Sequence, residues 1–287
     1  MKPRRGWFRD VKQDIGLQAI AGLALVLYIV FIVVPVLMSL RSSFIGLSNY
    51  QEMLHDSELH ASILFTLVMA AGVTIVANVI GIAFATLLNR TSLSYRVLRT
   101  IAFLPQVISG VIVGFVWKTI FTEDGLLNDV LTKIGIVHEP VQWLGTPHMA
   151  QLSVGIVVAW VLSGFTAVVY LAALQNIPGE LYDSSAIDGA NSRQQFRMIT
   201  FRMVAPATTI SVTISLITVL KLYDIITVLT SGGPAYATES TAQYIVKMAF
   251  TSDRFGYASA IAMALLALSA VIALSVTSLL RRREVDL

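Results

Sequence analysis

The chain has 287 residues, of which 56% are hydrophobic and 13% are charged, and its mean hydropathy is +0.76. A soluble domain is normally about 45–50% apolar and about 25% charged, so this chain has too little polar surface to cover a water-soluble globule. The composition disfavours a soluble enzyme, a nucleic-acid binder and a secreted toxin. The sequence contains no cysteine, which excludes disulfides and thiolate metal sites.

Six stretches are long and apolar enough to cross a membrane as helices, which takes about 20 residues each. Residues 1–16, before the first stretch, are basic, as in a signal peptide. The first stretch is too long for a signal peptide and has no small-x-small cleavage site before Arg41, so we expect it to be retained. The prediction is an all-α, polytopic membrane protein with spans over Leu17–Leu40, Ala61–Leu88, Thr100–Phe121, Gln151–Leu174, Ala205–Leu229 and Tyr257–Leu280.

The distribution of lysine and arginine predicts the orientation of these spans. Fourteen lie on one side: in residues 1–16, in the loops after the second and fourth spans, and in the basic tail 281–287. Four lie on the other side, and Lys118 and Lys221 lie at or inside helix ends. Because an excess of lysine and arginine marks cytoplasmic loops, we expect both termini in the cytoplasm.

The longest outer loop carries a helical pattern of apolar residues. Leu126, Val130 and Ile134 recur at helical spacing, which predicts a short amphipathic helix at the membrane interface, with a packed surface loop as the alternative. In the third span, Pro105 predicts a bend.

The cytoplasmic loop between spans four and five, residues 176–204, has the signals of two short helices around a turn. We expect Asn176 to cap the first helix and Gly189 to end it. Ser192 with Gln195 predicts a capping box for the second helix. A loop with this much local structure is typical of a docking surface.

Within this loop, the segment Ile177–Ala190 resembles the signature of the permeases of binding-protein-dependent ATP-binding-cassette (ABC) importers, Ile-Pro-x-Glu-Leu-Tyr-(Glu-Ala-Ala)-x-Ile-Asp-Gly-Ala. The residues of this segment are typical of the sugar-importer branch of the family, the maltose and glycerol-3-phosphate type. Asp183-Ser184-Ser185 stands at the Glu-Ala-Ala position, and Phe201-Arg202 stands where the family usually has Leu-Pro.

The resemblance runs from about Asn49 to the C-terminus. The Gly-Gly-Pro after the fifth span is more like the first permease of the sugar type than its usual partner. The further matching segments are Leu87-Leu88-Asn89-Arg90, Arg99-Thr100-x-x-Phe103-Leu104-Pro105, Gly114-x-x-Trp117, Tyr170-Leu171-Ala172-Ala173-Leu174-Gln175 and Leu229-Thr230-x-Gly232-Gly233-Pro234.

The resemblance implies a type I ABC importer permease fold in the bacterial inner membrane. In such importers two related permeases form the pathway, two ATPase subunits bind ATP-Mg beneath them, and an extracytoplasmic binding protein delivers the substrate. The implied organisation is a basic cytoplasmic N-terminus (1–16), a first transmembrane helix with its outer loop (17–60), a five-helix permease core (61–280) with the coupling loop 176–204, and a basic cytoplasmic tail (281–287).

The resemblance also implies roles for residues of the loop. In the family, this segment inserts as a coupling helix into a cleft of an ATPase subunit. Asp188 and Gly189 would set the turn, and the helix before them would supply the contact face. The implied coupling residues are Glu180, Asp183, Ala186, Asp188 and Gly189.

The sequence shows no motif for nucleotide binding, metal binding or catalysis. The phosphate-binding pattern Gly-x-x-x-x-Gly-Lys-Ser/Thr does not occur, so the energy source is expected to be another subunit or an ion gradient. The resemblance to ABC importers implies the first of these, with ATP hydrolysis in a separate ATPase subunit. Four histidines lie in outer loops without metal-like spacing, and we expect no metal, no bound cofactor and no catalytic residue: His55, His60, His138 and His148.

Polar residues within spans are candidates for the substrate pathway. Lys221 and Asp224, three apart on one face near the outer end of span five, fit either a pathway role or a local ion pair. Asn78 and Gln106 are weaker candidates. An ion-coupled secondary transporter would keep carboxylates deep in its helices, so it is a less favoured reading than a permease for another small solute of the same importer class. The identity of the sugar stays open.

Overall fold

The structure is a computed structural model, which describes residues 15–44, 48–90, 92–282 and 284. Every regular element in these residues is helical, so the expected all-α class is confirmed for this part of the chain. Most basic residues of the two predicted cytoplasmic ends lie outside the described residues: Lys2, Arg4, Arg5, Arg9, Lys12 and Arg283.

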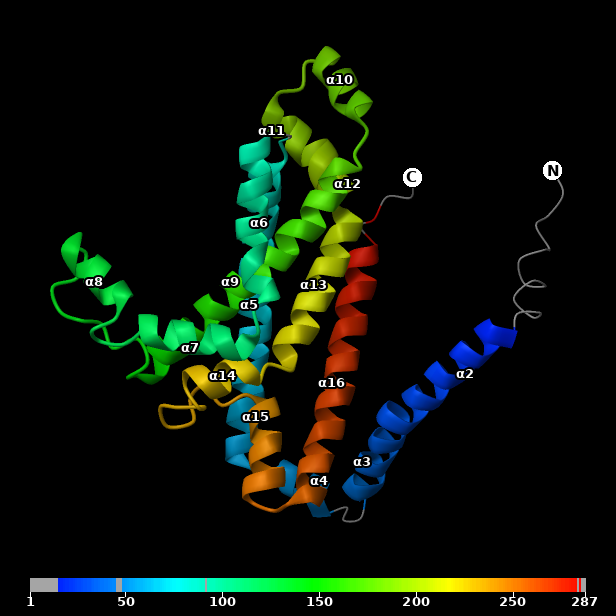
Figure 1. The fold of residues 1–287 in the computed structure, drawn as a ribbon, viewed down its shortest axis with the longest axis vertical. Coiled ribbons are helices and arrows are strands. Elements are labelled where there is room, and N and C mark those ends of the chain that lie inside the picture. Colours follow the sequence, from blue (N-terminus) through cyan, green and yellow to red (C-terminus); the bar gives the residue numbers. More distant parts are fainter. Residues whose placement is uncertain (1–14, 45–47, 91, 283, 285–287) are drawn as a thin grey trace. The chain divides into compact units, whose positions relative to one another are not determined.

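The chain divides into two compact units, one of residues 1–55 with 248–264 and the other of residues 56–247 with 265–287. In the first unit, α2 (Ile15–Tyr28), the π-turn η1 (Ile29–Val33) and α3 (Val34–Phe44) form one continuous helix (Figure 1). Large apolar side chains are exposed along it, as a helix facing lipid requires. The first expected span is therefore confirmed as a helix.

Polar contacts hold the rest of the first unit together. It contains α4 (Ser48–Met53) and the beginning of α16 (Phe255–Arg281). Glu52 forms an ion pair with Arg254, whose guanidinium lies 4.4 Å from the centre of the Tyr257 ring. Tyr50 donates a hydrogen bond of 3.1 Å to the buried hydroxyl of Ser43.

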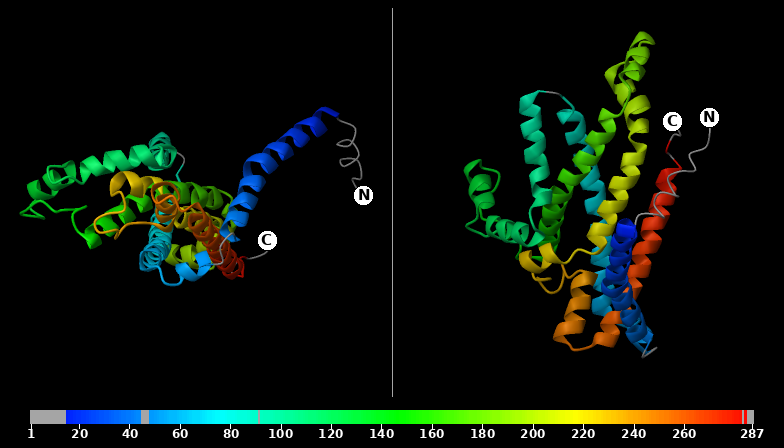
Figure 2. Two further views of the ribbon diagram at one scale, coloured as in Figure 1. Left: turned by 90° about the horizontal axis from the view of Figure 1, so that it is seen from below. Right: turned by 45° about the vertical axis from the view of Figure 1, so that its right-hand side comes forward.

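The core of the second unit is formed by α5 (Ser57–Leu88), α9 (Pro147–Gln175) and α13 (Ala205–Leu220), which run alongside one another (Figures 1 and 2). Small residues bring α5 and α9 into close contact, because a Cβ at Gly81 would overlap the side chain of Thr166. The Thr166 hydroxyl donates to the Ala77 carbonyl oxygen at 2.8 Å. Small residues and interhelical hydrogen bonds are the usual means by which helices associate in lipid.

The third predicted span is broken. Instead of one helix over Thr100–Phe121, the chain forms α6 (Leu93–Val107) and α7 (Gly110–Ile120), which meet at 101°. The linking residues Ile108 and Ser109 have ψ angles of 138° and 137°, which an α-helix does not accommodate. The span is bent, but at Ile108 and Ser109 rather than at Pro105, which lies inside α6, and the single continuous span is wrong.

The fifth predicted span, Ala205–Leu229, is also wrong as a single helix. Its helix α13 ends at Leu220, and α14 (Asp224–Leu229) begins after three non-helical residues. The Leu222 carbonyl oxygen, released by the break, accepts a hydrogen bond of 2.6 Å from Ser240. This contact satisfies a buried backbone group where the helix cannot.

The described residues contain four helices long and apolar enough to cross a membrane, or up to six if each of two bent pairs counts as one span. The second bent pair consists of 192–203 with α13, which meet at 63°. The range is compatible with six spans, but neither that number nor the cytoplasmic position of the termini follows from it. Both stay predictions.

The predicted outer helix is confirmed as α8 (Leu126–Lys133). Its buried Asn128 side chain fixes the loop that returns from it, because its amide nitrogen donates to the Val141 carbonyl oxygen at 3.0 Å. The Asn128 amide oxygen accepts from the Val141 nitrogen and from the Trp143 indole nitrogen, each at 3.1 Å. The helix therefore belongs to a hairpin that these hydrogen bonds hold together, and its position at the outer membrane interface stays a prediction.

Candidate functional site

The 176–204 loop begins with α10 (Gly179–Ile187), which lies at one end of the second unit (Figure 1). Its turn ends at Gly189, which has a φ of +82°, a conformation that favours glycine. The Ala190 nitrogen then donates to the Ser185 carbonyl oxygen at 2.9 Å and closes the helix end. The expected role of Gly189 as the end of this helix is confirmed.

The capping of the two helices differs by one or two residues from the sequence prediction. Asn176 does not cap α10; it follows the last residue of α9, and its amide donates to the Ala172 carbonyl oxygen at 2.9 Å. The capping box of α11 (Ser192–Gln195) is made by Asn191 and Gln194 rather than by Ser192 and Gln195. The shift frees Gln195 for a different contact.

Gln195 and Tyr182 tie α10 to the segment that follows it. The Gln195 amide donates to the Tyr182 carbonyl oxygen at 3.2 Å and to the Ser185 hydroxyl at 3.0 Å. The Tyr182 hydroxyl shares a hydrogen bond of 2.9 Å with the buried Thr200 of the π-turn η2 (Phe196–Thr200). These three bonds fix one face of α10 and orient the other face outward.

All five residues predicted for coupling are exposed. Glu180, Asp183 and Ala186 are exposed on the helix, and Asp188 and Gly189 are exposed at its end. A hollow of about 310 Å³ opens beside Asp188 and Gly189, between the end of α10 and α11. The five residues are thus exposed within α10 and directly after it, and their role in coupling stays a prediction.

Ile187 is a further exposed residue of α10 that the sequence analysis did not select. Its side chain is 87% exposed, although isoleucine is strongly apolar. It lies four residues after Asp183 and so shares that side of the helix. This spacing is the signal that could have identified it, and it gives α10 an exposed apolar side chain beside its carboxylates.

The four pathway candidates do not come together. Lys221 and Asp224 do not share a helix face, because the break between α13 and α14 lies between them. Asp224 lies against Gly110, the first residue of α7, where a Cβ would overlap its carboxylate. Gln106 is exposed in the last turn of α6, before the same bend, whereas Asn78 is buried.

Asn78 is engaged in helix packing in this structure. Its amide nitrogen donates to the Thr74 carbonyl oxygen at 2.8 Å, and its oxygen accepts from the Tyr170 hydroxyl at 2.9 Å. Tyr170 belongs to α9, so this pair joins α9 to α5. Of the four, Asp224 and Gln106 are the ones exposed beside the bend between α6 and α7.

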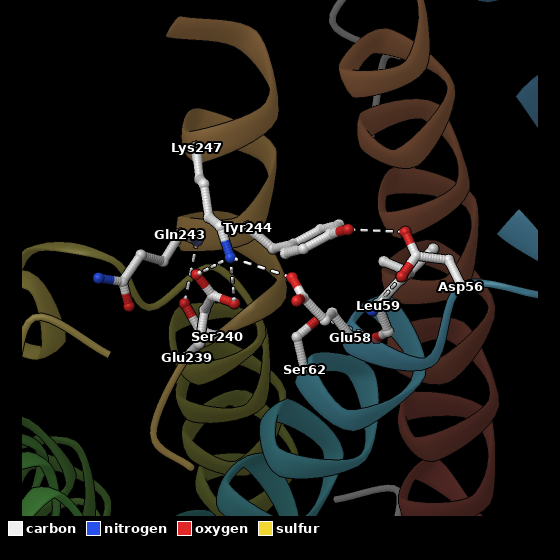
Figure 3. Close-up of polar contacts among 9 residues, drawn as sticks. All are labelled: Asp56, Glu58, Leu59, Ser62, Glu239, Ser240, Gln243, Tyr244 and Lys247. Carbon is white, nitrogen blue, oxygen red and sulfur yellow. Dashed lines mark hydrogen bonds and ion pairs between the residues drawn. The ribbon is translucent and has the colours of Figure 1, made fainter. Parts of the chain in front are cut away.

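At the other end of the second unit, five charged or phenolic side chains form a group that the sequence analysis missed, here called the Lys247 cluster: Asp56, Glu58, Glu239, Tyr244 and Lys247 (Figure 3). The Lys247 ammonium lies 3.1 Å from a carboxylate oxygen of Glu58 and 3.4 Å from one of Glu239. The Tyr244 hydroxyl donates to Asp56 at 2.6 Å. Asp56 also caps α5 by accepting from the Leu59 nitrogen at 3.1 Å.

Glu239 and Lys247, which form an ion pair, differ in how far they are exposed, and both have shifted pKa values. The Glu239 side chain is only 6% exposed, and burial raises its pKa although the charge of Lys247 opposes the shift. Burial works to lower the pKa of Lys247, but the hydrogen bond to Glu58 and the charge of Glu239 outweigh it and raise that pKa. The cluster joins α5 to α15 (Thr241–Val246) and the residue after it. Its hydrogen bonds and ion pairs hold these elements together. The described part of the chain contains no group of three or more potential metal ligands.

Comparisons with known proteins agree with the signature of the loop. Residues 77–285 match the family model described as "Binding-protein-dependent transport system inner membrane component". A probable permease protein for starch degradation products from Thermoanaerobacterium thermosulfurigenes is 35% identical over 244 residues, covering 85% of this chain and 82% of that protein. A lactose transport system permease protein from Rhizobium radiobacter is 31% identical over 263 residues, covering 87% and 88%.

A solved structure shares the fold. A chain of a bacterial ABC transporter involved in the import of the acidic polysaccharide alginate superposes with a TM-score of 0.85. The match covers 96% of this chain and 98% of that chain at 24% sequence identity. The likeness establishes that the two chains have the same arrangement of helices.

Proposed function

Because the chain belongs to the family of inner-membrane components of binding-protein-dependent transport systems, we propose that it is a permease subunit of an ATP-driven importer for a sugar or a related polyol. The observation that carries this proposal is the exposed face of α10, which holds the family's signature residues at one end of the second unit. The sugar class is supported by relatives named for starch products and lactose. The chain would form half of the translocation pathway.

The coupling contact is proposed for Glu180, Asp183, Ala186, Asp188 and Gly189. Their exposure and the three hydrogen bonds on the opposite face of α10 support this role, since a docking helix must be rigid on one side and open on the other. ATP-driven closure of the ATPase pair would move this helix and with it α9 and α13. The permease pair would then alternate between inward-open and outward-open states, because ATP binds those states with different affinity.

The proposed assembly contains a second related permease, two ATPase subunits that bind ATP-Mg, and an extracytoplasmic binding protein. The loop 176–204 and both termini would face the cytoplasm, in line with the excess of arginine and lysine on that side. The Lys247 cluster would then lie at the outer end of the second unit. The chain itself would bind no nucleotide and perform no chemical step.

The experiment that tests the coupling role is co-purification of the tagged chain in mild detergent, with the recovered subunits identified by mass spectrometry. We expect a second permease and an ATPase with the unchanged chain. Asp188→Arg is expected to lower ATPase recovery by at least about tenfold, because a misplaced charge at a docked surface costs more than about 1.4 kcal/mol. Asp129→Arg makes the same change on the exposed part of α8 and is the matched control.

Two results would contradict the proposal. Unchanged ATPase recovery with Asp188→Arg would remove the coupling role of this surface. Recovery of the chain alone would contradict the heteromeric importer itself, and the uptake of sugars would then need another energy source.

The substrate pathway is proposed to include Asp224 and Gln106, with Lys221 and Asn78 as further candidates. The exposure of Asp224 and Gln106 on either side of the bend between α6 and α7 supports the first two. Uptake of candidate sugars by cells that carry Asp224→Asn tests this assignment. A change in rate or in substrate range is expected, and an uptake profile identical to that of the unchanged chain would refute it.

A further inference from the structure

A groove of about 510 Å³ lies in the second unit where the 176–204 loop enters α13. The residues that line it include the basic Arg197 and Arg202 and the apolar Met198, Phe201 and Leu280. The apolar side chains are open to solvent, since Met198 is 62% and Phe201 53% exposed. The groove therefore offers a cationic surface directly beside an apolar one.

The two arginines of the groove have no carboxylate partner among the described residues. Both ion pairs of the second unit's described residues lie at Lys247, in the cluster near the start of α5. Two more arginines, Arg281 and Arg282, are exposed directly after Leu280. Among the described residues, Arg197 and Arg202 therefore form no ion pair within the chain.

The groove lies at the ends of two apolar helices. The hydroxyls of Thr213 and Thr277 share a hydrogen bond of 2.8 Å, which places α13 beside α16 about one turn of α16 before Leu280. In a membrane-spanning chain, the ends of such helices lie at the level of the lipid headgroups. Arginine at this level attracts anionic lipid, at about 1 kcal/mol for each residue near the surface.

We propose that this groove binds an anionic phospholipid. The phosphate diester would contact Arg197 and Arg202, and the first part of an acyl chain would lie along Met198, Phe201 and Leu280. A guanidinium group binds a phosphate through two parallel hydrogen bonds, which suits it to this role better than lysine. The proposal rests on the proposed function in one respect: the orientation proposed there places the groove in the cytoplasmic leaflet of the membrane.

The groove includes two residues at which this chain departs from the usual signature that it resembles. Phe201 and Arg202 stand where the signature of the family has Leu-Pro, so this chain has an aromatic ring and a cation at that point. The outward face of α10, by contrast, carries Glu180, Asp183 and Asp188. The charges of the two surfaces are opposite, which favours an anion at the groove.

The test uses the full chain, purified in detergent and stripped of lipid, with native mass spectrometry to measure the binding of dioleoyl phosphatidylglycerol and dioleoyl phosphatidylcholine. The unchanged chain is expected to prefer the anionic lipid. Arg197→Gln with Arg202→Gln is expected to reduce this preference about thirtyfold, which corresponds to about 1 kcal/mol for each arginine. Arg197→Lys with Arg202→Lys keeps the charge and should give a smaller loss, which keeps the test valid if the glutamine variant does not fold.

The matched control removes two exposed arginines outside the groove, Arg96→Gln with Arg193→Gln, and should leave the preference unchanged. An equal loss in this control would overturn the proposal, since it would reduce the effect to net charge. Full competition by glycerol 3-phosphate would overturn it in favour of a free phosphate site. Retained lipid preference together with lost ATPase recovery in the glutamine variant would identify a protein-docking surface instead.

The coupling proposal and the lipid proposal fail independently. Asp188→Arg is expected to lower ATPase recovery and to leave the lipid preference as it is. If the lipid preference is absent from the unchanged chain, the groove proposal fails while the coupling role stands.

Discussion

The 176–204 loop and the Lys247 cluster, at opposite ends of the second unit, use charge in opposite ways. In the cluster, the buried carboxylate of Glu239 is paired with Lys247 and the carboxylate of Asp56 with Tyr244. On α10, the described carboxylates face outward, and the hydrogen bonds that fix the helix come from Tyr182 and Gln195. Charge that is paired internally joins two elements of the chain, whereas charge that is left exposed on a fixed element is available to a partner.

The largest effect on stability is expected from Lys247→Met, which leaves the Glu239 carboxylate buried without its cation. Loss of one partner of a buried pair costs about 3–5 kcal/mol, and the partial exposure of Lys247 reduces our expectation to about 2 kcal/mol. Thermal melting in detergent measures it. Glu58→Gln removes the more exposed partner of the same lysine and should cost less than about 1 kcal/mol.

The decisive comparison is between the stability losses of Lys247→Met and Glu58→Gln. If Glu58→Gln destabilised the chain as much as Lys247→Met, burial of Glu239 would not control the cluster. Lys247→Met combined with Glu239→Met should recover much of the loss, because the unpaired charge is then removed.

A second prediction concerns pH and the same carboxylate. The pKa of Glu239 is raised by burial, and the charges of Glu58 and Asp56 add to the shift against the opposing charge of Lys247. The folded state therefore binds this proton more tightly than the unfolded chain does, so stability rises as the pH falls through the raised pKa toward the ordinary glutamate value. The raised pKa of Lys247 acts only above the ordinary lysine value, where stability is lost as the pH rises.

The melting temperature at pH 8 and at pH 5 measures this dependence. Glu239→Gln should reduce the difference between the two values relative to the unchanged chain. An identical difference in both proteins would show that other groups cause the pH dependence.

A third prediction concerns the end of α10. Gly189→Ala places a Cβ in open space but at a φ of +82°, so its cost is backbone strain of about 1–2 kcal/mol. We expect a several-fold loss of ATPase recovery with little change in overall melting. Gly179→Ala also adds a Cβ in open space, but at the start of α10 without a positive φ, and should be neutral or slightly favourable. Equal effects of the two variants would exclude the turn conformation as the cause.

Much of the fold follows from the sequence because long apolar runs suffice to predict α5, α9 and α16. The break inside the third predicted span does not follow, because the apolar run continues across Ile108. In the fifth span, Lys221 and Asp224 flank the break, but their spacing fitted a pathway role or an ion pair on one continuous helix equally well. At the second break, Ser240 supplies a hydrogen-bond partner for the Leu222 carbonyl oxygen. Hydropathy along the chain does not contain that information.

The functional residues likewise fall into a group that the sequence predicts and a group that it does not. The signature residues of α10 are local in sequence, and the structure leaves them exposed. The Lys247 cluster joins Asp56 and Glu58 to Glu239 and Lys247, which lie more than 180 residues further along the chain. No local sequence pattern predicts contacts between residues so far apart, so the sequence shows these residues only as separate charges in loops.

The smallest effect is expected from Tyr182→Phe, which removes the hydrogen bond to Thr200 and keeps the ring. A neutral hydrogen bond contributes about 1 kcal/mol, so overall melting should change little. The loss acts locally on the inward face of α10, where only the bonds from Gln195 would still hold the helix. Amide hydrogen exchange over residues 179–190 should therefore become several-fold faster, while exchange in α5 stays the same.

Thr200→Val is the partner variant, because it removes the other end of the same bond. The double variant should exchange no faster than the faster single variant, as expected when both act on one interaction. Additive acceleration would mean that Tyr182 and Thr200 hold the loop through separate contacts. In that case the fixed inward face that distinguishes α10 from the Lys247 cluster would depend on Gln195 instead.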